Sequence, residues 1–188
     1  MTVGSDAGPT RSLLVLVGPP GVGKTTVGRM LAEHWSVPFC DTDDVVSQRA
    51  GRSVGDLFIM SGESEFRLLE RLAVADALAT FTGVLALGGG AVADSDTRRL
   101  LIGHRVVFLD VGLADAARRV GLNRDRPLLL GNIRGQWVDL MTARRPWYEQ
   151  VATATVGTDG LTPQQVTAKV LAALDEAAAP ASPAGDPR

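Results

Sequence analysis

The stretch Gly18-Pro19-Pro20-Gly21-Val22-Gly23-Lys24-Thr25 decides the fold, because it matches the phosphate-binding loop pattern G-x-x-x-x-G-K-[ST]. An apolar run at 13–17 precedes this phosphate loop and helix-forming sequence follows it, which disfavours an incidental glycine-rich turn. The glycines let backbone N–H groups turn toward phosphate oxygens, and the N-terminus of the following helix adds the positive end of its dipole. Lys24 would reach the β- and γ-phosphates, and the Thr25 hydroxyl can ligate Mg²⁺.

Short apolar runs alternate with helix-like stretches along the rest of the chain. Apolar runs of this length are typical of strands buried on both faces, and their alternation with helices predicts a parallel sheet covered on each side. The sequence therefore predicts an α/β fold. The expected strands are 13–17, 37–40, 84–87, 106–109 and 154–156, and the expected helices are 25–34, 63–79, 113–120 and 162–178.

Composition limits the domain organisation and the partners. The chain has 188 residues, of which 45% are hydrophobic and 21% charged, as in one globular domain, expected at 12–179 between flexible tails at 1–11 and 180–188. A formal net charge of −2 provides no field for DNA or a lipid surface, so no nucleic-acid or membrane partner is expected. Cys40 is the only cysteine, which excludes an internal disulfide and fits a reducing, cytoplasmic setting.

Carboxylates follow the second expected strand, in the sequence Asp41-Thr42-Asp43-Asp44. Strand C-termini in open α/β sheets face the ligand crevice, so these side chains can point at a bound nucleotide. One aspartate can hold Mg²⁺ or its waters, and another can accept a proton from an attacking hydroxyl group. We expect such functions for Asp41 and Asp43, and a helix-capping role for Asp44.

Three other segments stand out by their glycines or by the spacing of their charges. Gly88-Gly89-Gly90 follows the third expected strand and suits a backbone that approaches a ligand closely. The segment 121–135 has glycine at both ends and three arginines inside, which fits either a mobile cationic loop or an ordinary surface connection. The segment 62–71 spaces its charges as a surface ion-pair ladder on a helix would, with Glu63, Arg67, Glu70 and Arg71.

Taken in order, these motifs resemble the shikimate kinase family over about 13–163. Many small kinases share a phosphate loop and a glycine run, but the complete set is specific. It comprises Asp41-Thr42-Asp43, Gly62-Glu63 with Phe66-Arg67 and Glu70, Gly88-Gly89-Gly90, Arg126-Pro127-Leu128-Leu129, and Arg144 with Pro146 and Tyr148. Two departures occur: Val46-Ser47 stands where the family often has Ile-Glu, which puts a local helix contact in doubt, and Val22 replaces a commoner serine at a variable position.

The resemblance implies transfer of the ATP γ-phosphoryl group to the 3-hydroxyl of shikimate. The products would be shikimate 3-phosphate and ADP, on the route to chorismate and the aromatic amino acids. It implies a three-layer fold like that of nucleoside-monophosphate kinases, with a five-stranded parallel sheet and a mobile lid around 124–132. It also implies a cytoplasmic monomer that uses Mg²⁺.

Site roles carry over position by position from the same resemblance. Shikimate would contact Asp43, Arg67, Gly88, Gly89, Gly90 and Arg144. The nucleotide would contact Gly21, Val22, Gly23, Lys24, Thr25, Thr26, Arg119, Arg126 and Pro163. Thr25 and Asp41 would hold the metal, and Lys24, Asp43 and Arg126 would be catalytic. These residue types fit a small carboxylate with several hydroxyls, because arginines suit the carboxylate and Asp43 suits the hydroxyls.

Two alternatives remain. Another phosphate-loop kinase, for gluconate or a nucleotide, would share the loop, but Arg67 and Arg144 favour a carboxylate acceptor. A nucleotide-dependent switch that binds a partner would normally carry Asp-x-x-Gly and Asn-Lys-x-Asp signatures. The first pattern does not occur, and neither Lys24 nor Lys169 stands in the second.

Overall fold

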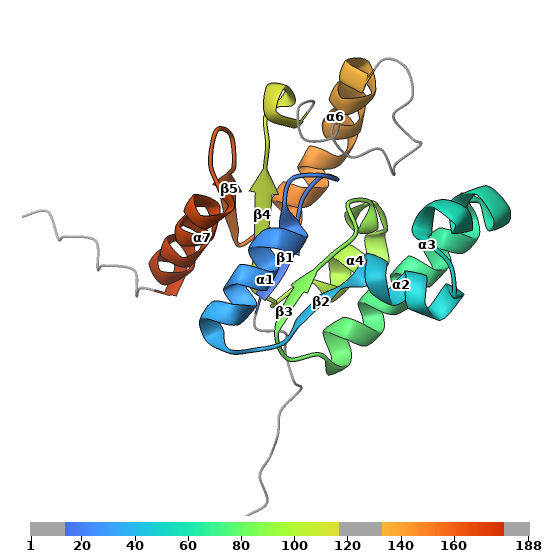
Figure 1. Cartoon of the computed structure of the whole chain (residues 1–188), viewed down its shortest axis with the longest axis horizontal. Helices are drawn as coiled ribbons and strands as arrows, with labels where there is room; N and C mark the ends of the chain where they lie inside the picture. Colours follow the sequence, from blue (N-terminus) through green and yellow to red (C-terminus); the bar gives the residue numbers. More distant parts are fainter. Residues whose placement is uncertain (1–13, 117–132, 179–188) are drawn as a thin grey trace, which may run out of the picture.

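Five parallel strands form the centre of the molecule (Figure 1). The structure, a computed structural model, describes residues 14–116 and 133–178. The strands pair in the order β2-β3-β1-β4-β5, and every pair is parallel, which confirms the predicted sheet. Their bounds are β1 Leu14–Val17, β2 Phe39–Asp41, β3 Val84–Ala86, β4 Val106–Asp110 and β5 Ala154–Gly157.

Helices cover both faces of the sheet. A right-handed crossover places α1 on one face of the sheet, where α7 packs beside it (Figure 1). The chain reverses its direction across the sheet after β2. The later right-handed crossovers therefore place α3, α4 and α6 on the other face. The helix α2 packs against α3 beside the β2 edge. The bounds are α1 Lys24–Trp35, α2 Thr42–Ala50, α3 Val54–Thr80, the short 3-10 helix η1 Ala91–Ala93, α4 Ser95–Leu100, α6 Ile133–Val151 and α7 Pro163–Ala178.

The central strands are buried because helices cover both of their faces. All four residues of β1 are at most 1% exposed, and the first four residues of β4 are fully buried. A separate small cluster joins α2 to α3 through Val46, Leu57, Phe66 and Ala73. Val46 therefore serves packing, and the neighbouring Ser47 hydroxyl donates to the Asp43 carbonyl inside α2. The departure at Val46-Ser47 is confined to this helix pair.

Several expected element boundaries were wrong. The helix expected at 63–79 begins earlier, at Val54, where the Ser53 side chain caps it by accepting from the Asp56 N–H, and it kinks at Gly62 (φ 83°). The whole of α6 was missed, and its first residues fall inside the segment expected to be a loop. Of the helix expected at 113–120, positions 113–116 are helical. Residues 117–120 of that expected helix, the expected lid at 124–132 and both expected tails lie outside the described residues. Of the segment 121–135, positions 133–135 are described, as the start of α6.

Within the two described ranges, no helix combines the length and apolar character needed to cross a bilayer.

The functional side chains gather where the strands end. The carboxyl ends of β1, β2 and β3 reach the same edge of the sheet, with Asp41 beside Ala86 in the register of β2 and β3. This edge is where open parallel sheets bind their ligands.

Candidate active site

The phosphate loop joins β1 to α1 and leaves the helix N-terminus open toward a ligand. Gly23 precedes the helix with φ 104°, a left-handed conformation that glycine adopts without strain, and no side chain among the described residues caps α1. The first N–H groups of α1 are therefore oriented for an anion. The Lys24 ammonium donates to the carbonyls of Gly18 (2.8 Å) and Pro19 (3.0 Å), so it lies across the loop where phosphate oxygens would sit.

A pocket of about 170 Å³ adjoins this loop. The loop and α1 form one wall, and the start of α7 forms the other. Pro163, which was expected on the nucleotide side, lines it together with Leu161 and Val166, two residues that the sequence did not single out. The pocket thus offers apolar surface next to the phosphate loop, as the base of a nucleotide requires.

A hydroxyl group and a carboxylate meet behind the phosphate loop. The Thr25 hydroxyl donates to Asp41 Oδ2 at 2.7 Å, although the two residues come from α1 and β2. Oxygen donors of this kind suit Mg²⁺, which in phosphoryl-transfer sites takes one or two protein groups, phosphates and waters rather than an all-protein cage. Within the described ranges, no group of three or more His, Cys, Asp or Glu side chains is placed to hold a metal ion.

Asp41 also caps α2, which corrects the expectation for Asp44. Its Oδ1 accepts the N–H of Asp43 at 3.1 Å, whereas Asp44 lies in the first turn of the helix. The first turn is still a favourable place for a negative charge, since it faces the positive end of the helix dipole. A single aspartate thus orients both the Thr25 hydroxyl and the start of the helix that carries Asp43.

The segment 88–90, called here the glycine turn, lies between the acidic segment and α6. The fully buried Thr42 hydroxyl accepts the Gly88 N–H at 2.9 Å and so joins the end of β2 to this turn. A side chain at Gly88 would collide with the Asp43 carboxylate. A Cβ at Gly89 would lie 2.8 Å from Pro20 Cδ, in the phosphate loop. The turn therefore brings the nucleotide loop and Asp43 together, and only glycine permits this approach.

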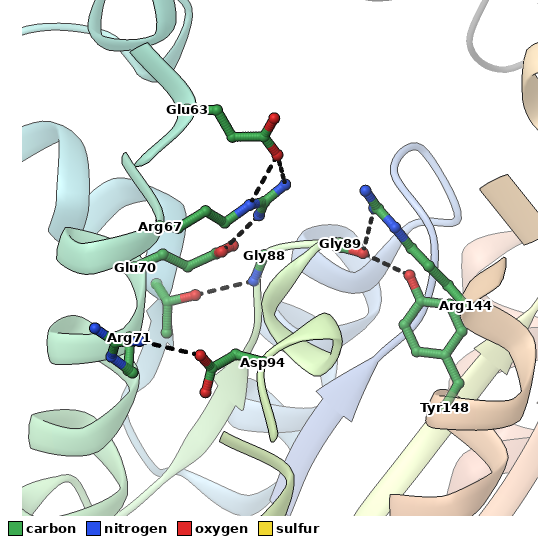
Figure 2. Close-up of polar contacts among 10 residues, drawn as sticks. Glu63, Arg67, Glu70, Arg71, Gly88, Gly89, Asp94, Arg144 and Tyr148 are labelled. Atoms are coloured by element: carbon green, nitrogen blue, oxygen red, sulfur yellow. Dashed lines mark hydrogen bonds and ion pairs between the residues drawn. The ribbon is translucent and has the colours of Figure 1, made fainter. Parts of the chain in front are cut away.

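Two arginines reach the glycine turn from opposite sides (Figure 2). Arg144, on α6, donates to the Gly89 carbonyl at 2.9 Å. Arg67, on α3, lies so close to Gly90 that any side chain there would collide with its guanidinium group. The structure thus brings together the predicted residues Asp43, Arg67 and Arg144 around the predicted glycines. Arg119 and Arg126 lie outside the described residues.

Carboxylates and aromatic rings hold the Arg67 guanidinium group. Glu70 accepts from it at 2.6 Å and Glu63 at 3.3 Å, and the rings of Phe58 and Phe66 lie 5.9 and 5.2 Å from it. Glu70 is only 3% exposed, so the expected surface ladder is wrong at this position. Arg71 does not extend the ladder, because it pairs across to Asp94, beyond the glycine turn, at 3.2 Å (Figure 2).

Burial gives Glu70 an unusual effect on stability. Desolvation raises its pKa, assisted by Asp43, although Arg67 and Arg144 oppose the shift. Because the folded pKa exceeds the unfolded one, the unfolded chain releases this proton first, and stability decreases as pH rises between the two values. Relative to wild type, Glu70→Gln should gain melting temperature as pH rises from about 4 to 8. Thermal melts of both proteins across this range test the prediction.

Glu63→Gln provides the matched control, since it removes an exposed carboxylate from the same guanidinium group. A stabilising salt bridge at Glu70 would give the opposite sign, with the Gln variant losing melting temperature relative to wild type as pH rises. That outcome would contradict the dominant role of burial.

A second ion pair fixes α6 to the sheet. Arg145 donates to both oxygens of Asp110, at 2.7 and 2.9 Å, and its guanidinium carbon lies 5.8 Å from the Phe108 ring. Asp110 ends β4, the strand beside β1. The pair therefore places the neighbouring Arg144 relative to the strands that carry the phosphate loop. Neither Arg145 nor Asp110 could be singled out from the sequence, because the two are far apart in it and form no motif.

Since the phosphate loop and two arginines converge on one turn, the fold and the site define a small-molecule kinase of the phosphate-loop class, and hence a phosphotransferase. A family model described as shikimate kinase matches residues 20–175. The chain belongs to the shikimate kinase family.

Relatives and solved structures agree. The shikimate kinase of Streptomyces coelicolor is 53% identical over 163 residues, which cover 87% of this chain and 95% of that protein. The structure of the shikimate kinase from Acinetobacter baumannii in complex with shikimate matches with a TM-score of 0.84 and 32% identity, over 89% of this chain and 95% of the other. A gluconokinase from Sinorhizobium meliloti matches with a TM-score of 0.57 and 18% identity, over 90% of this chain and 94% of the other, which shows a shared fold only.

Proposed function

We propose that this enzyme transfers the γ-phosphoryl group of ATP to the 3-hydroxyl of shikimate, giving shikimate 3-phosphate and ADP for chorismate and aromatic amino-acid biosynthesis. The observation that carries the proposal is the placement of Arg67 and Arg144 on opposite sides of a glycine turn that touches the phosphate loop. Such a pair suits the carboxylate of a small acceptor, and the contact with Pro20 keeps that acceptor next to the nucleotide.

The acceptor hydroxyl would face Asp43. The Asp43 carboxylate lies against Gly88, on the side of the turn that the acidic segment forms. From there it would accept a hydrogen bond from the 3-hydroxyl, orient its oxygen toward the γ-phosphorus and take up its proton during transfer. Arg67, held by Glu63 and Glu70, would keep the carboxylate of the acceptor away from the carboxylate of Asp43.

Lys24 and the loop N–H groups would stabilise the charge on the transferred phosphoryl group. Thr25 and Asp41 would hold Mg²⁺, which supplies further neutralisation of phosphate charge when bound.

For Arg126 and Arg119, the family resemblance supports contacts to the nucleotide. It also supports a cytoplasmic monomer, and light scattering on a sizing column would test the oligomeric state.

An assay coupled to ADP release distinguishes the acceptors. Wild-type enzyme with ATP and Mg²⁺ would be given shikimate, gluconate and nucleoside monophosphates in parallel. We expect the highest kcat/KM with shikimate. Equal or faster turnover of gluconate would overturn the proposal, and omission of Mg²⁺ with a chelator present should abolish turnover if the metal assignment is right.

Arg144 and Arg126 should differ in the state in which they act. Arg144 would hold the acceptor equally in ground and transition states, so Arg144→Ala should mainly raise the shikimate KM. Loss of a charge-assisted pair costs about 2 to 5 kcal/mol, and since Arg144 is only half-buried we expect the lower end, roughly 30-fold in KM. Arg126→Ala should mainly lower kcat, because that arginine would meet charge as the phosphoryl group transfers.

Initial rates over matched shikimate and ATP ranges separate these effects. Arg49→Ala, which breaks an ion pair with Asp76 on the surface, is a control for loss of an arginine. Thermal melts exclude unfolding. If Arg126→Ala changed only the shikimate KM and Arg144→Ala changed only kcat, the two roles would be reversed and the mechanism wrong.

A further inference from the structure

One carbonyl group receives two hydrogen bonds from α6. Gly89 O accepts from Arg144 at 2.9 Å and from the Tyr148 hydroxyl at 2.6 Å (Figure 2). The two donors lie four residues apart on the helix and so share one face. They differ in burial: Arg144 is half-exposed, whereas Tyr148 is fully buried and stacks on Phe108 with ring centroids 4.9 Å apart.

The direction of this carbonyl fixes the direction of the next N–H group. The C=O of Gly89 and the N–H of Gly90 belong to one planar trans peptide, so they point in opposite directions. With the carbonyl turned to α6, the Gly90 N–H points away from it, and Figure 2 shows α3 with Arg67 on that side of the turn. Gly90 is buried, and among the described residues its N–H donates to no protein group. A buried donor in this position needs an acceptor, which a ligand oxygen or a water would supply.

We propose that Tyr148 is a positioning residue for the phosphoryl acceptor, whose hydroxyl fixes the Gly89–Gly90 peptide so that the Gly90 N–H points into the space between Arg67 and Arg144. The inference rests on the proposed function, since that space is where the acceptor would bind. Glycines leave a peptide free to rotate, so a glycine turn needs an external constraint. Arg144 cannot supply it alone, because the same guanidinium group must adjust to the acceptor, whereas the phenol is fully buried and packed on Phe108.

The phenol is suited to this role over the whole working pH range. Burial raises the pKa of Tyr148 to about 12. The hydroxyl therefore stays protonated and donates, and the positioning effect should not vary between pH 6 and 9. Substitution of Tyr148 by phenylalanine removes the hydroxyl and leaves the ring and its packing on Phe108 intact.

Tyr148→Phe should raise the shikimate KM about fivefold, as expected for one lost hydrogen bond, with kcat and the ATP KM within twofold of wild type. Shikimate binding measured by calorimetry should weaken by the same factor. Thr153→Val is the control for loss of a hydroxyl, because the Thr153 hydroxyl donates to the Val106 carbonyl at 2.9 Å and accepts the Val106 N–H at 3.1 Å, before the start of β5 and away from the glycine turn. Its melting temperature should fall at least as much, since it loses both bonds, while its shikimate KM stays at the wild-type value.

A purely structural role for the hydroxyl would give a lower melting temperature with an unchanged shikimate KM, and that result would overturn the proposal. A loss of kcat at unchanged KM would overturn it too. Failure of wild-type enzyme to phosphorylate shikimate would instead refute the proposed function, and the inference with it, before any variant is compared.

A second measurement does not depend on the stability of the variant. Tyr148 is the only tyrosine in the chain, so growth with 3-fluorotyrosine labels this residue alone. Saturation with shikimate should shift the single fluorine resonance more than saturation with ADP, because the hydroxyl borders the acceptor side. An unchanged resonance with shikimate would contradict the proposal.

Discussion

Replacing Lys24 with alanine should lower kcat by about 10²- to 10³-fold, the usual effect of removing one preorganised group that stabilises transition-state charge. The ammonium group lies across the phosphate loop on the carbonyls of Gly18 and Pro19, so it packs no core and its loss should leave the fold intact. Steady-state rates with saturating shikimate and ATP, together with thermal melts, measure the effect.

Lys169→Ala is the matched control for this experiment. Lys169 is the only other lysine, and it lies exposed on α7. It should retain wild-type kcat. A Lys24→Ala enzyme with a near-normal rate would refute the assignment of the loop.

Asp43→Asn should lower kcat by about 10²- to 10⁴-fold, the range over which a positioned general base accelerates proton transfer. The amide keeps the size of the carboxylate next to Gly88, so the shikimate KM should change little by comparison. Initial rates across a range of shikimate concentrations separate the two parameters.

Asp44→Asn removes the neighbouring carboxylate from the same turn of α2, where Asp44 is exposed. This control should keep wild-type kcat. If both variants lost activity equally, the effect would come from the charge of the turn rather than from proton transfer at Asp43.

The sheet could be predicted because its strands are local, continuous apolar runs. The expected strand at 106–109 lies inside β4, and the phosphate loop falls where its motif predicts. Asp43 could be named from its place after the second expected strand, whereas roles for Arg67 and Arg144 came only through the family resemblance. The structure brings all three to one turn. Their proximity depends on tertiary packing that no local pattern encodes.

Other features depend on burial, which a charge pattern does not reveal. Glu70 has the spacing of a surface ion pair, yet α3 turns it inward, where Arg67 pairs with it and Arg144 adds a weaker favourable charge. The Thr42 hydroxyl carries no signal in the sequence, since its partner Gly88 follows only after 46 residues. The helix α6 was missed because glycine and proline interrupt a sequence that tertiary contacts nevertheless keep helical.

The glycine turn also bears on the order in which the enzyme assembles. Two side-chain hydrogen bonds at the phosphate loop close short segments of chain. Lys24 bonds to Gly18 over 6 residues, and Thr25 bonds to Asp41 over 16. The contacts that hold the turn span 46 to 59 residues. Longer closures cost more chain entropy and are gained later in folding. The glycine turn therefore takes its shape only after α2 and α6 have docked, so folding of the acceptor side is coupled to assembly of the sheet and its helices.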